Sequence, residues 1–168
     1  MLKDIQIGQT VGKLRNFIIE PFVAHKEEEE AYVCIYSHRN GDTILFHHLG
    51  GVDIGDVDAK ALRLEVPIDD HVTEDQIKQK LLVNLSSDKQ DRVAKFIAEL
   101  YRIYERLFFT YLEINPLGML FIYIFVHSFF SYKFFLHIVV TNDNIYVLDL
   151  AAKLDTTAEY LCKKKWGE

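Results

Sequence analysis

Hydrophobic residues in the first third of the chain occur in short runs of the length expected for β-strands. Three such runs cover residues 17–23, 31–36 and 43–48. Pro21 cannot donate a hydrogen bond to a neighbouring strand, so the first strand is expected to end there. Asn40 and Gly41 stand between the second and third runs and predict a hairpin with a type I′ turn. Residues 50–58 are rich in glycine and aspartate and predict a loop.

Two segments in the middle of the chain carry the start signals of helices. Thr73 with Gln76, and Ser87 with Gln90, have the spacing of a capping box. In the second helix the apolar residues recur at three- and four-residue spacing: Val93, Phe96, Ile97, Leu100, Ile103, Tyr104, Leu107 and Phe108. The charged residues fall off this stripe, so the pattern predicts a helix that buries one face.

Residues 109–117 and 145–150 predict two further strands, and a long apolar run separates them. Residues 118–138 hold eight of the chain's 22 aromatic residues, and Lys133 is the only formal charge between residues 117 and 140. Taken alone, this run is long enough to form a transmembrane helix.

Removing residues 118–138 gives a simpler pattern. Leu117 is then followed by Val139, and a strand, a polar turn and a returning strand form an ordinary β-hairpin. We therefore expect an apolar insertion at a hairpin. Its bias toward Phe, Ile, Tyr, Leu and Ser is typical of translated AT-rich non-coding sequence, which favours a retained intron or gene-model artefact. The alternative is a single-pass membrane protein with its span at residues 117–140.

The composition is that of an ordinary globular domain, with 168 residues, 49% of them hydrophobic and 26% charged. Together with the pattern of elements, it predicts one α+β domain over residues 1–168. The net charge of −6 argues against nucleic-acid binding, which normally requires a basic face. Two cysteines cannot form a disulfide framework and residues 1–13 show no signal peptide, so a cytoplasmic location is expected.

Three polar residues near the predicted hairpin have the chemistry of a magnesium site. Glu113 and Asn115 point to the same face of a strand, because side chains alternate along it. Asp149 lies beside them if the hairpin closes. Carboxylate and amide oxygens suit Mg²⁺, which takes its remaining ligands from water and nucleotide phosphates. On spacing alone, polar residues on a half-exposed sheet are the more common explanation.

Two weaker signals point to the other parts of a nucleotide. The strand interrupted at Pro21 leaves backbone groups that could meet an adenine edge, although an edge strand leaving a sheet explains it better. Glu30 directly precedes a strand, and a carboxylate held there could accept the two hydroxyls of a ribose. His47 and His48 are expected on opposite faces of a strand, so they are interpreted as structural. Cys34 is interpreted as inert core.

The runs at residues 16–23, 32–36, 45–48, 50–61, 111–117, 147–153 and 163–167 resemble a known family. They are similar to the ATP-grasp region of the ATP-citrate synthase family, itself similar to the β subunit of succinyl-CoA synthetase. The resemblance covers nearly all of the chain outside the first dozen residues and the apolar insertion. It implies a partial ATP-grasp fold with a mixed or antiparallel sheet packed by helices.

The resemblance also implies a reaction, in which citrate, CoA and ATP give acetyl-CoA, oxaloacetate, ADP and phosphate by way of a phosphohistidine. Its cofactors are ATP and Mg²⁺. The roles implied by position are adenine contacts at Glu20, Pro21 and Val23, ribose binding at Glu30, Mg²⁺ binding at Asn115 and Asp149, and contact with the phosphohistidine at Glu113. Phosphoryl transfer depends mainly on positioning and charge neutralisation, which such groups supply.

The chain also departs from the family pattern. It has Leu49 where the family has Glu and Ala24 where the family has Pro. It lacks the first ATP-grasp subdomain and the citrate-binding, CoA-binding and phosphohistidine portions. We therefore expect a fragment that is inactive by itself, binds ATP weakly or not at all, and has the remainder of the enzyme as its partner. A membrane association is not expected, and a catalytically dead interaction module is a further alternative.

Overall fold

The computed structural model describes residues 4–13, 19, 25–50, 57–119, 139–140 and 145–166. The strand predicted at residues 17–23 lies outside these ranges, except Ile19, which is exposed and in no regular element. Strands β1 (Asp4–Ile7) and β2 (Thr10–Lys13) form a small two-stranded sheet of their own, which the sequence did not predict.

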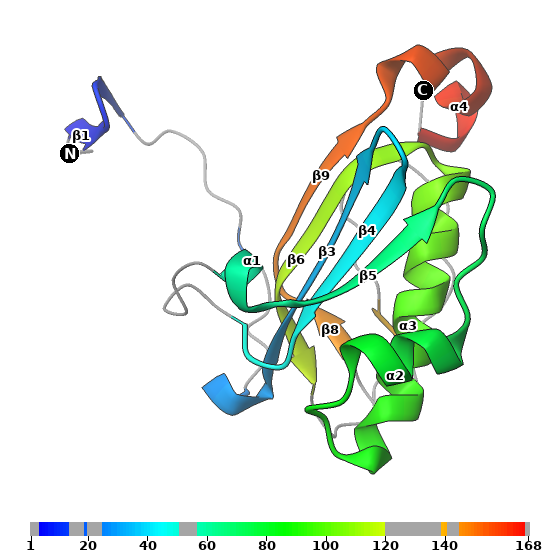
Figure 1. The fold of residues 1–168 in the computed structure, drawn as a ribbon. Helices are drawn as coiled ribbons and strands as arrows, with labels where there is room; N and C mark the ends of the chain where they lie inside the picture. The colour runs from blue at the N-terminus through cyan, green and yellow to red at the C-terminus, as the bar shows by residue number, and fades with distance from the viewer. Residues whose placement is uncertain are drawn as a thin grey trace.

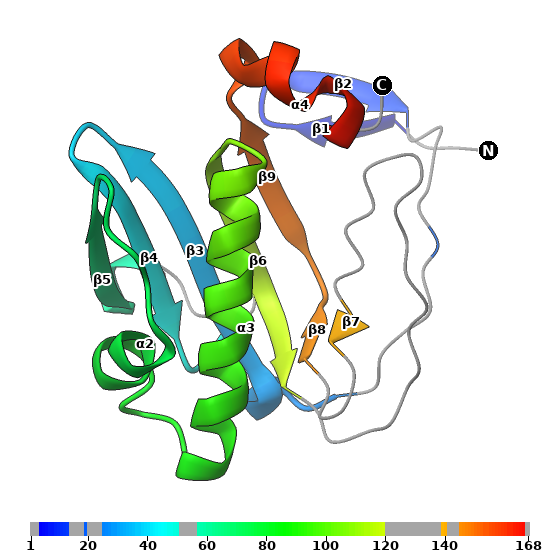
Figure 2. The same cartoon turned by 90° about the vertical axis from the view of Figure 1, so that its right-hand side faces the viewer.

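Over the described residues, the main sheet has seven strands and every strand pair is antiparallel. The strands are β3 (Glu30–His38), β4 (Gly41–His47), β5 (Leu62–Pro67), β6 (Phe109–Met119), β7 (Val139–Val140), β8 (Ile145–Val147) and β9 (Leu150–Leu154). Their order is β5-β4-β3-β6-β8-β7, and β9 also pairs with β6. The helices α2 (Glu74–Leu81) and α3 (Ser87–Arg106) lie on one side of this sheet (Figures 1 and 2). The predicted α+β class is therefore confirmed.

Alternation along the strands separates two faces of the sheet. Ala31, Val33 and Ile35 of β3 belong to the main core against α2 and α3. Their neighbours point the other way, where a smaller cluster forms from Tyr32, Cys34, Leu45 and Val57. Val57 comes from the short helix α1 (Val57–Lys60), which Figure 1 shows on the side of the sheet away from α3. We call this side, with the odd-numbered residues 111–115 of β6, the open face.

The hairpin predicted around Asn40 and Gly41 is confirmed, but its turn type is wrong. His38 pairs with Gly41, so Arg39 and Asn40 form the loop and Gly41 already belongs to β4. Neither loop residue has a positive φ, whereas Gly41 has φ 144°. Glycine is required there because a Cβ atom would lie 2.1 Å from the carbonyl oxygen of Val66 in the adjacent strand.

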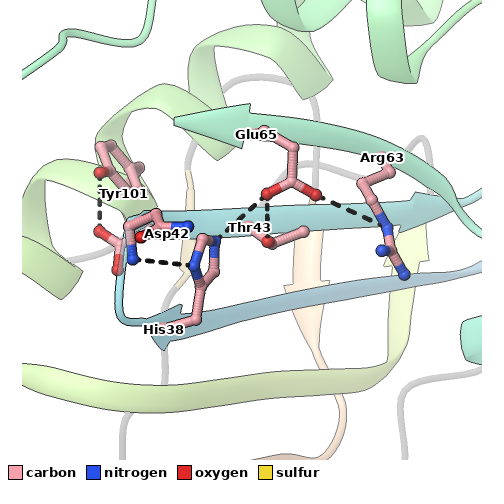
Figure 3. A network of polar contacts seen from close by, with 7 residues as sticks. His38, Asp42, Thr43, Arg63, Glu65 and Tyr101 are labelled. Atoms are coloured by element: carbon pink, nitrogen blue, oxygen red, sulfur yellow. Dashed lines mark hydrogen bonds and ion pairs between the residues drawn. The ribbon is translucent and has the colours of Figure 1, made fainter. Parts of the chain in front are cut away.

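A polar network joins the strands β3, β4 and β5 near this hairpin (Figure 3). The Glu65 carboxylate accepts a hydrogen bond from Thr43 Oγ1 at 2.7 Å and lies 3.3 Å from His38 Nε2. Tyr101 of α3 donates to Asp42 at 2.8 Å. The network therefore anchors α3 and β5 to the same end of the sheet. The strand β5 was not predicted, although Leu62, Leu64 and Val66 alternate with polar residues.

The helix predictions are confirmed with one shift. Thr73 caps α2, since its side chain accepts from the Gln76 backbone and the Gln76 side chain accepts in return. The helix α3 begins at Ser87, one residue earlier than predicted, because Ser86 rather than Ser87 occupies the N-cap position. At the C-terminal side, α4 (Glu159–Trp166) is fastened to the end of α3 by a hydrogen bond from Trp166 Nε1 to the Leu107 carbonyl, 3.0 Å long.

Both ends of the apolar run are strands. Gly118 and Met119 continue β6 and pair with Tyr146 and Ile145, and β7 pairs with the same two residues of β8 from its other side. Neighbouring strands lie about 4.8 Å apart, so the two ends of the run are about 10 Å apart. The ends of a membrane-spanning helix lie roughly 30 Å apart.

A single transmembrane helix over residues 117–140 is therefore not favoured, because residues 117–119 and 139–140 belong to strands. Among the residues that the structure describes, no helix is long and apolar enough to cross a membrane. Residues 120–138 lie outside the described ranges.

Candidate functional site

A β-bulge in β6 shapes the candidate magnesium site. Ala31 pairs with Leu117 and Val33 pairs with Ile114, so β6 has one more residue than β3 over this stretch. Ile114 and Leu117 both pack into the main core, and the extra residue therefore lies in the Asn115–Pro116 pair, whose peptide bond is cis. Bulges of this kind are frequent next to active sites, where they redirect side chains.

The structure brings Asp149 directly beside Asn115. The Asn115 N–H donates to the Asp149 carbonyl at 3.3 Å, and the Leu148 N–H donates to the Pro116 carbonyl at 3.2 Å. These two bonds bridge the interval between β8 and β9. Asn115 is half-buried and Asp149 is exposed. The Asp149 side chain accepts the N–H of Leu150 through Oδ1 at 2.8 Å, which orients its carboxylate.

Glu30 occupies the first position of β3 and is held at both its backbone and its side chain. Its carbonyl accepts the N–H of Gly50 at 3.0 Å. A Cβ atom on Gly50 would lie 2.3 Å from the Ala31 carbonyl oxygen, so only glycine allows this approach. The Glu30 Oε1 atom lies 2.9 Å from His25 Nε2. Glu30 is thus fixed in place, as its position before a strand predicted.

Glu113 lies on the open face between the Cα positions of Cys34 and Ala151 in the neighbouring strands. Tyr111, two residues earlier on the same face, donates its phenol hydrogen to Glu113 Oε2. Burial, and then this hydrogen bond, raise the pKa of Tyr111 well above its ordinary value. Tyr111 therefore stays protonated and acts as a hydrogen-bond donor that orients the Glu113 carboxylate. The ammonium of Lys153 lies 5.2 Å from the centre of the Tyr111 ring.

Cys34 is a buried, protonated thiol, and the two histidines lie next to each other at the end of β4. Burial raises the pKa of Cys34 to about 11, so it remains a neutral thiol at physiological pH. The expectation that His47 and His48 point to opposite faces is wrong, because β4 ends at His47 and the rings lie 4.8 Å apart. Burial, and then the adjacent His47, lower the pKa of His48. Within the described ranges, no group of three or more His, Cys, Asp and Glu side chains is placed to hold a metal.

Three predicted site residues, Glu20, Pro21 and Val23, lie outside the described residues. Sequence reasoning missed two residues that orient the others, His25 beside Glu30 and Tyr111 beside Glu113. The only available signal for Tyr111 was its spacing of two residues from Glu113 on one strand. His25 had no such signal, since a turn separates it from Glu30.

The candidate groups follow one another along the open face. Glu30 pairs with Gly118, and Asn115 is three residues further back along β6, about 10 Å away. Glu113 follows two residues beyond Asn115. The order is therefore a carboxylate that can accept hydroxyls, then an oxygen pair that can bind a cation, then a second carboxylate.

Comparison with known proteins shows a family with this chemistry. Residues 1–121 match the family described as the ATP-citrate synthase ATP-grasp domain. The chain belongs to the ATP-citrate synthase family. The sequence resemblance and the ATP-grasp fold that it implied are thus confirmed.

Individual members of the family match nearly the whole chain. The ATP-citrate synthases of Bos taurus and Homo sapiens are 51% and 50% identical over 166 residues, which cover 99% of the chain and 13% of each relative. The structure of ATP citrate lyase from Methanothrix soehngenii in complex with citrate and coenzyme A matches with a TM-score of 0.71 and 32% identity. That match covers 99% of this chain and 33% of the archaeal chain. The chain therefore spans about an eighth of the length of its animal relatives.

Proposed function

We propose that the open face of β3 and β6 supplies the ribose- and metal-binding side of the Mg-ATP site of ATP-citrate synthase. The order of groups along this face carries the proposal. In phosphoryl transfer, the sugar of the nucleotide is followed by its phosphates, and these are followed by the group that receives the phosphoryl. Along the open face, Glu30 is followed by the Asn115–Asp149 pair, and this pair is followed by Glu113. The two orders agree. The family match supports an ATP-grasp domain, and hence ATP as the ligand.

Asn115 and Asp149 have the donor set that Mg²⁺ prefers, a carboxylate oxygen and an amide oxygen. The cation takes its remaining ligands from water and phosphate oxygens, and its chemical contribution is to neutralise charge on the transferring phosphate. The two backbone hydrogen bonds between β6 and the residues before β9 bring the backbones of Asn115 and Asp149 together, which supports a shared metal site. Glu113, oriented by Tyr111, then lies next to the position of the phosphoryl acceptor.

The rest of the proposal rests on the family. Glu20, Pro21 and Val23 meet the adenine, and the complete enzyme converts citrate, CoA and ATP into acetyl-CoA, oxaloacetate, ADP and phosphate. The partners of this chain are then the citrate-binding and CoA-ligase portions of the same enzyme. A cytoplasmic location fits the two cysteines, Cys34 and Cys162, which are free and buried.

A chimeric enzyme tests this proposal. Residues 1–168 replace the matching segment of the Bos taurus ATP-citrate synthase, in one version complete and in a second version without residues 118–138. We expect ATP-dependent formation of acetyl-CoA by the second version. Inactivity of both versions would overturn the proposal.

A substitution in the active chimera then tests the site itself. Glu30→Gln keeps the size of the side chain but weakens its hydrogen bonds to sugar hydroxyls, so we expect the KM for ATP to rise roughly tenfold with a small change in kcat. An unchanged KM would show that the nucleotide does not use this carboxylate.

A further inference from the structure

The acidic run at residues 27–30 contains one carboxylate in unusual surroundings. Glu28 pairs with Lys26 at 3.7 Å, and about three quarters of each of these side chains is exposed. The Glu30 side chain is only 16% exposed, and its partner His25 is 13% exposed. Exposed ion pairs contribute little to stability or position, whereas a nearly buried pair has a defined geometry. Glu30 and His25 thus form the nearly buried pair of this segment.

Contacts other than the one with His25 fix the backbone of Glu30. Glu30 is the first residue of β3 and pairs with Gly118, and its carbonyl oxygen accepts a hydrogen bond from the Gly50 N–H. The preceding turn is closed separately, because the Lys26 N–H donates to Glu29 Oε2 at 2.8 Å. What His25 adds is therefore the direction of the Glu30 side chain.

The bond from His25 leaves Glu30 able to bind a sugar. A carboxylate has two oxygens with about four acceptor positions, and Oε1 uses one of them for His25 Nε2 at 2.9 Å. Two adjacent ribose hydroxyls are both donors. A free Glu side chain would lose rotamer entropy on binding them, and a carboxylate that is already oriented avoids much of that cost.

From this geometry we infer that His25 is a positioning residue, which holds the Glu30 carboxylate toward the ribose hydroxyls of the nucleotide. The inference rests on the proposed function, because it assigns a ribose to Glu30. It makes His25 a determinant of sugar recognition. A purely structural role of His25 would instead affect every nucleotide equally.

The test compares ATP with 2′,3′-dideoxy-ATP in the active chimeric enzyme. For His25→Ala we expect the KM for ATP to rise roughly five- to tenfold at unchanged kcat, while the KM for the dideoxy nucleotide changes less than about twofold. His25→Gln retains an N–H donor at a similar reach and should restore the preference for ATP. Glu28→Gln is the matched control, because it removes a charge from the same run without contacting Glu30.

Two results would overturn the inference. One is an equal rise of KM for both nucleotides in His25→Ala, which indicates a structural role. The other is no change for either nucleotide. Neither result changes the activity of the unsubstituted chimera or the effect of Glu30→Gln, which test the proposed function. The inference about His25 can therefore fail while the proposed function holds.

Discussion

One additional residue in β6 decides which side chains reach the open face. Strict alternation from Glu113 would place Leu117 on the same face as Asn115, yet Leu117 is fully buried in the main core with Ile114. The sequence could predict a shared face for Glu113 and Asn115, because the bulge begins only at the Asn115–Pro116 pair. It could not predict the bulge itself, since this depends on how β6 pairs with β3.

The assignment of Asp149 to Mg²⁺ leads to a first prediction. In the active chimera, Asp149→Asn keeps the shape of the side chain and removes its charge. We expect kcat/KM for Mg-ATP to fall at least tenfold and the half-saturating Mg²⁺ concentration to rise, because the cation loses a charged ligand. Steady-state assays over a Mg²⁺ titration measure both.

Asp91→Asn is the control for that experiment. It makes the same chemical change on α3, where Asp91 is exposed and pairs with Lys78. Autophosphorylation kinetics that stay unchanged in Asp149→Asn would remove Asp149 from the metal site.

The buried thiol of Cys34 leads to a prediction about pH. Burial raises its pKa from 9.0 to about 11, so the folded chain keeps this proton to a higher pH than the unfolded chain. Between pH 9 and 11 the unfolded state binds fewer protons, and the free energy of unfolding therefore falls as pH rises. From pH 8 to 10.5 this thiol alone accounts for about 2 kcal/mol.

Urea denaturation of the chain and of Cys34→Ala at several pH values measures that contribution. The stability of the variant should decline less steeply, by about that amount over the same interval. Tyr101, whose raised pKa does not depend on Cys34, titrates in both proteins and cancels in the comparison. Cys34 also raises the pKa of Tyr32, so the difference between the two proteins measures the thiol together with its effect on this phenol. Parallel curves for the two proteins would show that Cys34 does not titrate in this way.

Among the elements, helices were the easiest to predict because their signals are local. The capping box at Thr73 and the apolar stripe of α3 needed only neighbouring residues. Strands were harder, and β5 was missed despite its alternation. The stretch predicted as one strand at residues 145–150 is divided into β8 and β9, since β6 bulges opposite the junction.

Thr73→Ala tests the capping box. The substitution removes the acceptor for the Gln76 N–H, which then has no intrahelical partner. We expect a loss of about 1 kcal/mol in the free energy of unfolding, measured by urea denaturation. Gln79→Ala, an exposed position on the same helix, should cost nothing because alanine favours helices. Equal effects of the two substitutions would contradict the role of the cap.

The register around the apolar run indicates that residues 118–138 are additional to the fold. Gly118 and Val139 both pair with Tyr146. If residues 118–138 are removed, Val139 follows Leu117 directly and takes the place of Gly118 in β6. The strand then continues with the same register on β8. We propose that this run is an insertion at a hairpin, and the shared register on β8 at both of its ends supports this.

Two deletions of nearly equal length test this proposal. Deleting residues 118–138 should raise soluble yield and leave the far-UV CD spectrum of the sheet and helices unchanged. Deleting residues 119–138 keeps Gly118, moves Val139 one position along β8 and turns its side chain to the other face, so its melting temperature should be lower. Equal yields and melting temperatures of the full chain and both deletions would contradict the proposal. Sequencing the transcript across the codons of Leu117 and Val139 tests the intron interpretation.

At the scale of the whole molecule, the sheet gathers residues that are far apart in sequence. Asn115 and Asp149 meet across the apolar run, and Glu30 joins them from β3. The predicted hairpin connected Asn115 with Asp149, but only the family resemblance connected Glu30 with them as one site. The contact of His25 with Glu30 escaped both approaches, because it depends on how the turn before β3 folds back.

The one-sided character of this site leads to the last prediction, which concerns the chain by itself. Small-ligand sites normally enclose most of their ligand, and affinity depends on that enclosure and on groups already in place. In the site proposed above, the described residues present one open sheet face to the nucleotide, with oxygen groups assigned to its sugar and its cation. Tyr32 and Cys34 on this face pack with Val57 of α1, and Tyr32 donates a hydrogen bond to Asp58 of the same helix. They are therefore not free to contact a nucleotide.

We therefore expect the 168-residue chain to bind Mg-ATP with a Kd weaker than about 100 μM, if at all. Isothermal titration calorimetry at several magnesium concentrations measures this directly. The active chimera, which also contains the rest of the enzyme, serves as the comparison and should bind Mg-ATP at least tenfold more tightly. A low-micromolar Kd for the chain alone would mean that one face of the sheet suffices, and that the open face of β3 and β6 is a complete nucleotide site rather than one side of it.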